Sequence, residues 1–323
     1  MAAAEIPVFQ LNTGANIPSV GLGCFMGSRN FSDKQVYDMV SKAIKAGYRH
    51  FDTATGYGNE LQVGAAIRDS GVPRSEFYIT TKLANGDHHR VREAFEESLT
   101  RLDLEWIDLY LLHWPQASSG KVDFSDINAR NMALPPDASP TFVETYQKIE
   151  KLVETGRVKS IGVSNFSIKT LDELLPQCKI IPATNQVELH PCLPQDDLKS
   201  YCDAKGILLS AYSPLGRSQT FFGEQPLIAR LAEKYSGTWA QVVLSWGVQR
   251  GTVVLPKTEN EARMVANITL LQLSEEDLEA LNKLHLEPGM HRSLVPFHAD
   301  YGGVFGWTYE QLGWKMIKDG FVP

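Results

Sequence analysis

The chain has 323 residues, of which 43% are hydrophobic and 21% are charged, and these proportions are typical of a globular protein with a sizeable core. Its 31 lysines and arginines against 38 aspartates and glutamates give a formal net charge of -7, which excludes a general binder of nucleic acid or of an anionic membrane surface. No apolar run approaches the roughly 18 residues of a membrane helix, and the first residues lack a signal-peptide pattern, so we expect a cytoplasmic protein without a membrane partner.

A short hairpin is predicted at residues 8–17, with its turn at Asn12-Thr13-Gly14. After it, short apolar segments alternate with amphipathic stretches, which is the rhythm of repeated βα units. Most of the segments are continuously apolar, as expected of parallel strands that are buried on both faces. We predict eight strands, at Val20–Cys24, His50–Thr53, Phe77–Lys82, Ile107–His113, Ser160–Ser164, Ala183–Glu188, Leu208–Tyr212 and Val253–Pro256.

Helices are predicted between these strands. Ser32-x-x-Gln35 is typical of a capping box, Gly47 ends the helix that follows, and Thr238-x-x-Gln241 opens another helix later in the chain. Eight strands separated by helices favour a closed (β/α)8 barrel, with an open doubly wound sheet as the alternative. Because no change in composition marks a boundary, we expect one domain over residues 1–323, with residues 288–323 as a C-terminal extension, and we expect a monomer.

Two long segments depart from this rhythm. Residues 114–140 form a long polar loop after the fourth strand, on the face that carries the active site in a barrel. The extension after Pro288 contains seven aromatic residues, namely Phe297, Tyr301, Phe305, Trp307, Tyr309, Trp314 and Phe321. We expect both segments to close over the barrel mouth and set substrate choice; the alternative is that the tail packs on the side of the barrel and adds stability.

Several familiar motifs fail on inspection. Gly21-x-Gly23-x-x-x-Gly27 has its third glycine one position late for a dinucleotide fingerprint. Tyr201-x-x-x-Lys205 has the spacing of short-chain dehydrogenases without their early glycine-rich turn, so a helix-surface pair is the better interpretation. His88 and His89 are interpreted as solvated loop residues, and the four cysteines form no C-x-x-C pair, so we predict no metal site.

Polar residues stand at or just after the C-terminal ends of three consecutive predicted strands. Asp52 lies at the end of the second strand, Tyr57 follows it, Lys82 ends the third strand and His113 ends the fourth. In a barrel these ends share one face, which is where barrel enzymes carry their catalytic groups. The alternative for any one of these residues is a structural ion pair or simple packing.

The four residue types make chemical sense together. A phenol ionises near pH 10, so a nearby ammonium such as that of Lys82 would favour the phenolate of Tyr57 and ease proton donation. Buried Lys82 needs a counter-charge, which Asp52 offers. The imidazole of His113 can hold a carbonyl oxygen beside the phenol.

At this point the sequence resembles the aldo-keto reductase superfamily, from Gly21 to about Asn282. The matching stretches include residues 50–54 (HFDTA), 56–60 (GYGNE), 81–83 (TKL), 108–115 (DLYLLHWP), 156–166 (GRVKSIGVSNF), 185–188 (NQVE), 211–216 (AYSPLG) and 255–258 (LPKT). The family is a (β/α)8 barrel that moves a hydride between NADPH and a carbonyl. The resemblance implies that Asp52, Tyr57, Lys82 and His113 form a catalytic tetrad with Tyr57 as general acid.

The resemblance also implies a set of cofactor residues for NADPH or NADP+. Ser164, Asn165 and Gln186 would bind the nicotinamide carboxamide, and Tyr212 would stack on the nicotinamide ring. Ser213 and Leu215 would contact the pyrophosphate. The adenosine end would be held by Lys257, Thr258 and Arg263 at the 2′-phosphate and by Asn267 at the adenine; independently, two cations and a hydroxyl at a helix start after the eighth strand are typical of a phosphate site on a barrel.

One departure affects the substrate pocket. Many relatives carry Thr-Trp after the Gly-Leu-Gly segment, whereas this chain has Cys24-Phe25. With Phe25 and Trp114 in its wall, we expect an aromatic pocket that favours aromatic or medium aliphatic aldehydes over sugars.

The function we expect is NADPH-dependent reduction of aldehydes or reactive ketones, with a small carbonyl compound as the only partner. A polyol or glycerol oxidoreductase or an aldose reductase on the same site is one alternative. A nicotinamide-binding regulatory or structural protein on this scaffold is another.

Overall fold

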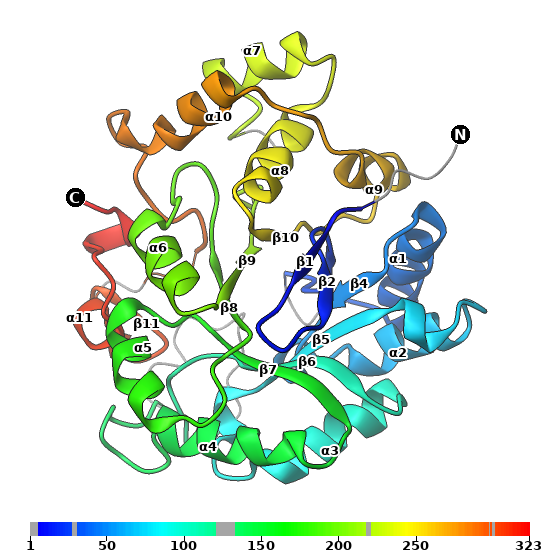
Figure 1. The fold of residues 1–323 in the computed structure, drawn as a ribbon, viewed down its shortest axis with the longest axis vertical. Helices are drawn as coiled ribbons and strands as arrows, with labels where there is room; N and C mark the ends of the chain where they lie inside the picture. Colours follow the sequence, from blue (N-terminus) through cyan, green and yellow to red (C-terminus); the bar gives the residue numbers. More distant parts are fainter. Residues whose placement is uncertain (1–5, 28–30, 121–132, 218–220, 297, 299–300) are drawn as a thin grey trace.

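The computed structural model describes residues 6–27, 31–120, 133–217, 221–296, 298 and 301–323. Within them, eight parallel strands follow one another in chain order around a ring, with helices outside (Figure 1). The strands are β3 (Leu22–Gly23), β4 (His50–Asp52), β5 (Tyr78–Leu83), β6 (Ile107–Leu112), β7 (Val158–Ser164), β8 (Thr184–Glu188), β9 (Leu208–Tyr212) and β10 (Val253–Leu255). The eight predicted strands are thus confirmed, with ends that shift by one or two residues.

The ring is closed between its first and last strands. Val20 bridges Val254 in parallel, and the Gly23 amide donates to the Pro256 carbonyl at 3.0 Å. A Cβ on Gly21 would stand 2.7 Å from the His50 ring, and one on Gly23 would stand 2.9 Å from the Leu255 carbonyl oxygen. These glycines therefore permit close packing of the strands where the ring closes, and the closed (β/α)8 barrel is confirmed over the open sheet.

The helices lie outside the ring. They are α1 (Asp33–Ala46), α2 (Glu60–Arg68), α3 (Val91–Leu102), α4 (Phe142–Val153), α5 (Ile168–Leu174), α6 (Asp196–Ala204), α7 (Pro226–Lys234), α8 (Trp239–Gln249), α9 (Glu261–Ile268), α10 (Glu275–Asn282) and α11 (Tyr309–Leu312). The Thr238–Gln241 capping box is present, and Gly47 ends α1 in a left-handed conformation. The predicted box at Ser32 is only half formed, because the Gln35 side chain donates to Glu259 at 2.8 Å instead of returning to the Ser32 amide.

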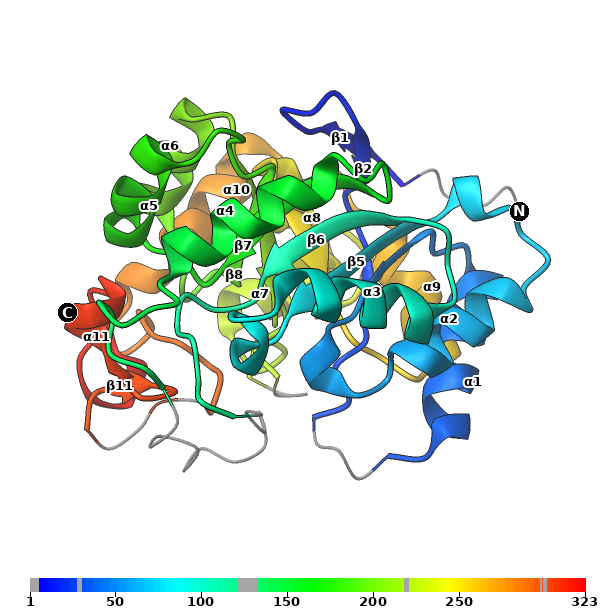
Figure 2. The same cartoon turned by 90° about the horizontal axis from the view of Figure 1, so that it is seen from below.

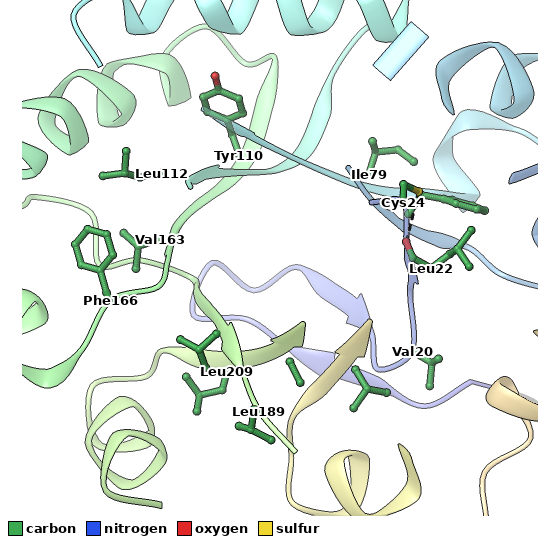
Figure 3. Close-up of a cluster of buried hydrophobic side chains, with 14 of the residues drawn as sticks. Val20, Leu22, Cys24, Ile79, Tyr110, Leu112, Val163, Phe166, Leu189 and Leu209 are labelled. Atoms are coloured by element: carbon green, nitrogen blue, oxygen red, sulfur yellow. Dashed lines mark hydrogen bonds between the residues drawn. The ribbon is translucent and has the colours of Figure 1, made fainter. Parts of the chain in front are cut away.

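Alternating side chains of the strands divide the core into two layers. On β6, Leu109 and Leu111 belong to the cluster inside the barrel, whereas Tyr110 and Leu112 belong to the layer between strands and helices. Figure 3 shows this outer layer, to which successive strands contribute. The predicted hairpin, β1 (Val8–Gln10) with β2 (Asn16–Pro18), adds Leu11 and Ile17 to the inner cluster.

The hairpin and the C-terminal tail, defined as residues 288–323, lie at opposite ends of the barrel (Figure 2). The described part of the tail contains β11 (Gly303–Val304), β12 (Trp307–Thr308) and α11. It joins the loop after β6 through two hydrogen bonds: Gln116 Nε2 donates to the Val304 carbonyl at 2.9 Å, and Trp307 Nε1 donates to the Leu134 carbonyl at 2.8 Å. The tail therefore belongs to the face where the strands end. Phe297 lies outside the described residues.

In the described part of the chain, no helix is long and apolar enough to cross a membrane, and no group of three or more His, Cys, Asp or Glu side chains is arranged to hold a metal ion.

Candidate active site

The ends of β4 and β5 bring three of the four predicted tetrad residues together. Lys82 Nζ donates to Asp52 Oδ1 at 2.6 Å, to the Thr53 carbonyl at 2.9 Å and to the Tyr57 hydroxyl at 3.4 Å. The side chains of Lys82 and Asp52 are 0% and 4% exposed. The buried ammonium is therefore paired with three oxygen atoms.

His113 follows β6 and completes the group. Its ring lies edge-on to the ring of Tyr57, with centroids 5.6 Å apart. Burial, and then the charge of Lys82, lowers the pKa of His113 well below its usual 6.5, so the imidazole is neutral at physiological pH. A neutral imidazole beside a phenol can donate a hydrogen bond to a carbonyl oxygen without adding a charge.

The protonation of Tyr57 differs from the expectation drawn from the sequence. Burial, and then the charge of Asp52, raises the pKa of Tyr57 well above its usual 10.0, whereas Lys82 was expected to favour the phenolate. The reason is that Asp52 lies 2.6 Å from Lys82 and offsets its charge, while burial still penalises the phenolate. Tyr57 is therefore protonated, which is the form a proton donor needs.

A cavity of about 530 Å³, here called the site cavity, opens beside these residues. This volume falls within the roughly 300–1,000 Å³ of small-molecule sites. Its wall contains most of the residues predicted from the sequence, namely Phe25, Asp52, Tyr57, His113, Trp114, Asn165, Gln186, Tyr212, Ser213, Leu215, Lys257, Thr258, Arg263 and Asn267. The predicted Lys82 and Ser164 lie behind the wall, not in it.

The predicted amide residues are held by hydrogen bonds within the protein. Gln186 Nε2 donates to Asp52 Oδ2 at 2.7 Å, so Gln186 also orients the buried carboxylate. Asn165 Nδ2 donates to the His113 carbonyl, and Asn165 Oδ1 accepts from the Tyr212 hydroxyl, both at 2.9 Å. The Ser164 hydroxyl donates to the Gln186 carbonyl at 2.8 Å and so ties β7 to β8.

Two of these residues have strained backbones. Asn165 has φ 66° and Ser213 has φ 47°, in the left-handed region that residues other than glycine seldom adopt. Such a conformation costs on the order of 1–3 kcal/mol and persists where the surroundings enforce it, as at binding sites. At Asn165 the side-chain hydrogen bonds to His113 and Tyr212 supply that enforcement.

The predicted phosphate residues lie at the other end of the site cavity. Arg263 Nε donates to Thr258 Oγ1 at 3.1 Å, and Lys257 forms an ion pair with Glu259. The side chains of Lys257 and Glu259 are 33% and 40% exposed. This rim is cationic and hydroxylated, and its lysine is reached by solvent, which suits a phosphate ligand.

Sequence reasoning missed several residues of this wall. Arg217, directly after the AYSPLG segment, lies with its guanidinium 5.5 Å from the Phe25 ring, and Trp239 and Glu259 also line the cavity. Asn59 links the segments that follow β3 and β4. Its Nδ2 donates to the Cys24 carbonyl, and its Oδ1 accepts from the Thr53 hydroxyl, both at 2.7 Å. Arg217 could have been predicted from the sequence, because it directly follows the AYSPLG segment.

Two rejected motifs have different outcomes. Tyr201 and Lys205 lie together on the helix surface as predicted, with Tyr201 donating to Asp172 at 2.6 Å. The interpretation of His88 as a solvated loop residue is wrong: His88 is 1% exposed, and burial lowers its pKa to about 3, whereas His89 is exposed. The sequence does not distinguish them because both lie in one polar loop.

Comparison with known proteins agrees with this geometry. The sequence profile of the Aldo/keto reductase family matches residues 19–285. This chain belongs to the aldo/keto reductase family. Among curated relatives of this aldo/keto reductase are the NADP(+) glycerol 2-dehydrogenase of Saccharomyces cerevisiae, 44% identical over 90% of this chain and 94% of the relative, and an aldehyde reductase of the same yeast, 42% identical over 88% and 92%.

A solved structure extends the comparison to the fold. An aldo-keto reductase of Bombyx mori in complex with NADP superposes with a TM-score of 0.78, at 37% identity, covering 87% of this chain and 93% of that one. This aldo/keto reductase therefore shares both its sequence family and its barrel with an enzyme whose structure contains the nucleotide.

Proposed function

We propose that this aldo/keto reductase uses NADPH to reduce aldehydes or reactive ketones to alcohols, with Tyr57 as the general acid. The observation that carries the proposal is the Tyr57 hydroxyl 3.4 Å from the buried ammonium of Lys82, in a cavity that His113 also lines. Proton donation to a carbonyl oxygen by a positioned side chain contributes about 10²–10⁴-fold to the rate.

The residues of the site cavity fit NADPH. The guanidinium and ammonium of Arg263 and Lys257, with the Thr258 hydroxyl, match a phosphate at one end. The amides of Asn165 and Gln186 and the ring of Tyr212 match a planar carboxamide-bearing ring at the other end. When bound, NADPH supplies the hydride.

The side chains of the tetrad would then handle the oxygen of the substrate. His113, being neutral, donates to the carbonyl oxygen and holds it beside the phenol. Tyr57 gives its proton to that oxygen as negative charge grows there, and Lys82 stabilises the phenolate that remains. Asp52 and Gln186 keep Lys82 in place.

The substrate class follows from the aromatic wall. Phe25 lies 5.0 Å from the Tyr57 ring, and Trp114, which is 3% exposed, lines the same cavity. These rings favour aromatic or medium aliphatic aldehydes over highly hydroxylated sugars. Among the described residues the tail does not line the site cavity, but it contacts the wall of that cavity at Trp114, whose ring centroid lies 5.0 Å from that of Phe305.

The test is NADPH oxidation followed by absorbance with benzaldehyde, hexanal and xylose, alongside NADP+ reduction with glycerol. We expect the two aldehydes to give the highest kcat/KM. Faster glycerol oxidation would instead support a glycerol dehydrogenase, the second candidate, which the name of the 44% identical yeast relative favours. NADPH binding without turnover of any substrate would indicate a nicotinamide-binding regulatory or structural protein.

A further inference from the structure

A second cavity, of about 280 Å³, lies under the C-terminal tail and is here called the tail cavity. Val295, Trp314, Met316 and Val322 of the tail line it from one side. The other side includes the segments that follow β7 and β8, with Ile168 at the start of α5, and also Trp114 and Tyr212. The proposed reaction uses Trp114, Asn165 and Tyr212 of this lining, but none of the tail residues that line it.

The tail is held firmly as the roof of this cavity. Glu188, at the end of β8 and 5% exposed, accepts hydrogen bonds from the Ser293 hydroxyl at 2.5 Å and the Leu294 amide at 2.7 Å. Further along, the Ser293 amide donates to the Gly320 carbonyl and the Val322 amide donates to the His291 carbonyl, both at 2.9 Å. These hydrogen bonds hold the tail against β8 and join its beginning to its end, so the wall that the tail gives to the cavity is fixed in place.

The lining indicates the chemistry of a ligand. Trp114, Phe166 and Trp314 give it an aromatic interior. The charged groups nearby are already paired, Asp197 with Lys315 at 2.7 Å and Asp196 with Arg250, and the Glu188 carboxylate is occupied by the tail. A neutral ligand therefore meets less desolvation cost here than a charged one.

One polar group in the lining is suited to a donor. His285 Nδ1 lies 2.8 Å from the Asn282 carbonyl, which can only accept, so Nδ1 carries the hydrogen. In the neutral ring Nε2 is then an acceptor. The His291 ring stands 4.9 Å away, edge-on to His285, and adds to the aromatic surroundings.

From this geometry we propose that the tail cavity is a second ligand site, separate from the site cavity, for a neutral aromatic molecule of one or two rings that carries an N–H or O–H donor. Trp114, Asn165 and Tyr212 line both cavities, so they form the partition between them. Because Asn165 hydrogen-bonds both Tyr212 and the His113 carbonyl, a ligand on this partition touches groups that hold the catalytic face in place.

Isothermal titration calorimetry of indole into the full-length protein saturated with NADP+ tests the site independently of turnover. We expect one indole per chain, and binding of benzofuran, which has the same shape without the N–H, about three- to tenfold weaker. Benzaldehyde, which cannot be reduced in the NADP+ complex and has no N–H or O–H donor, should compete with indole no better than benzofuran does.

Filling variants locate the site. Val322→Trp and Ile168→Trp place a larger side chain on opposite walls of the tail cavity and so fill part of it. Each should weaken indole binding at least about tenfold while NADP+ binding persists. Ile317→Trp is the matched control, since Ile317 is 54% exposed and outside the lining. Absence of indole binding, stronger displacement by benzaldehyde than by benzofuran, or unchanged affinity in both filling variants would overturn the proposal.

Discussion

Two lysine–carboxylate pairs serve opposite ends of one cavity, and they differ chiefly in burial. Asp52–Lys82 has side chains 4% and 0% exposed, and Gln186 and the Thr53 carbonyl complete its hydrogen bonds. Lys257–Glu259 has side chains 33% and 40% exposed. A buried pair cannot lose one partner without stranding a charge, whereas an exposed pair contributes only about 0–1 kcal/mol.

This difference suggests different roles. The buried pair is fixed and can set the position of Tyr57 to within a hydrogen-bond length. The exposed pair can exchange: Lys257 can leave Glu259 for a phosphate at little cost, because water and Gln35 remain available to the carboxylate. Substitutions in and beside the two pairs distinguish these roles.

The largest effect is expected at the group that the buried pair positions. Tyr57→Phe removes the proton donor and leaves the cofactor residues in place, so kcat/KM for aldehyde reduction should fall on the order of 10²–10⁴-fold. NADPH affinity, measured by fluorescence titration, should stay near that of the wild type. Turnover at the wild-type rate would refute the role of Tyr57.

A pair of matched substitutions tests the contrast directly. Lys82→Met should reduce turnover about 100-fold or more and lower the free energy of unfolding by about 3–5 kcal/mol, because the Asp52 carboxylate stays buried without its cation. Lys257→Met should change that free energy by less than about 1 kcal/mol and mainly raise KM for NADPH. Urea unfolding and steady-state kinetics measure both; similar stability losses in the two variants would contradict the contrast.

At the exposed end, Arg263→Ala should raise KM for NADPH about tenfold or more and leave KM for NADH almost unchanged. Only NADPH carries the 2′-phosphate that a guanidinium binds with two hydrogen bonds. Arg230→Ala, on the exposed surface of α7, is the control. Equal losses with both cofactors would place Arg263 away from the phosphate.

The effect that is smallest at neutral pH concerns two neighbouring histidines that differ in burial. Burial lowers the pKa of His88 to about 3, so below pH 6.5 His88 binds a proton in the unfolded chain but not in the folded protein. The free energy of unfolding should therefore decrease as the pH is lowered. The contribution of His88 to this decrease should approach about 1.4 kcal/mol per pH unit. His88→Gln should flatten the dependence of the unfolding free energy between about pH 6 and 4.5, whereas His89→Gln should not; identical slopes would show that His88 is protonated in the folded protein.

The alternation of short apolar segments with amphipathic segments along the chain determined most of the architecture. Continuous apolar runs such as Leu109–Leu112 predicted parallel strands, because strands buried on both faces are mostly apolar. Once eight such strands are expected, their C-terminal ends must share one face, so Asp52, Lys82 and His113 could be grouped from their places alone. Strand ends shifted by a residue or two because hydrogen bonding with neighbours, not composition, sets them.

The tertiary packing determined the side-chain partners and protonation states that no local sequence pattern encodes. Gln186 meets Asp52 across 134 positions of sequence, and burial, not Lys82, governs the proton of Tyr57. The aromatic tail was expected to close over the barrel mouth and set substrate choice; its described residues lie on that face but line the tail cavity and not the site cavity, because Glu188 holds Ser293 and Leu294 beside β8. Pairing across the fold and exclusion of water depend on which surfaces meet, and side chains of the same type, such as His88 and His89, acquire different chemistry only when the folded chain buries one and not the other.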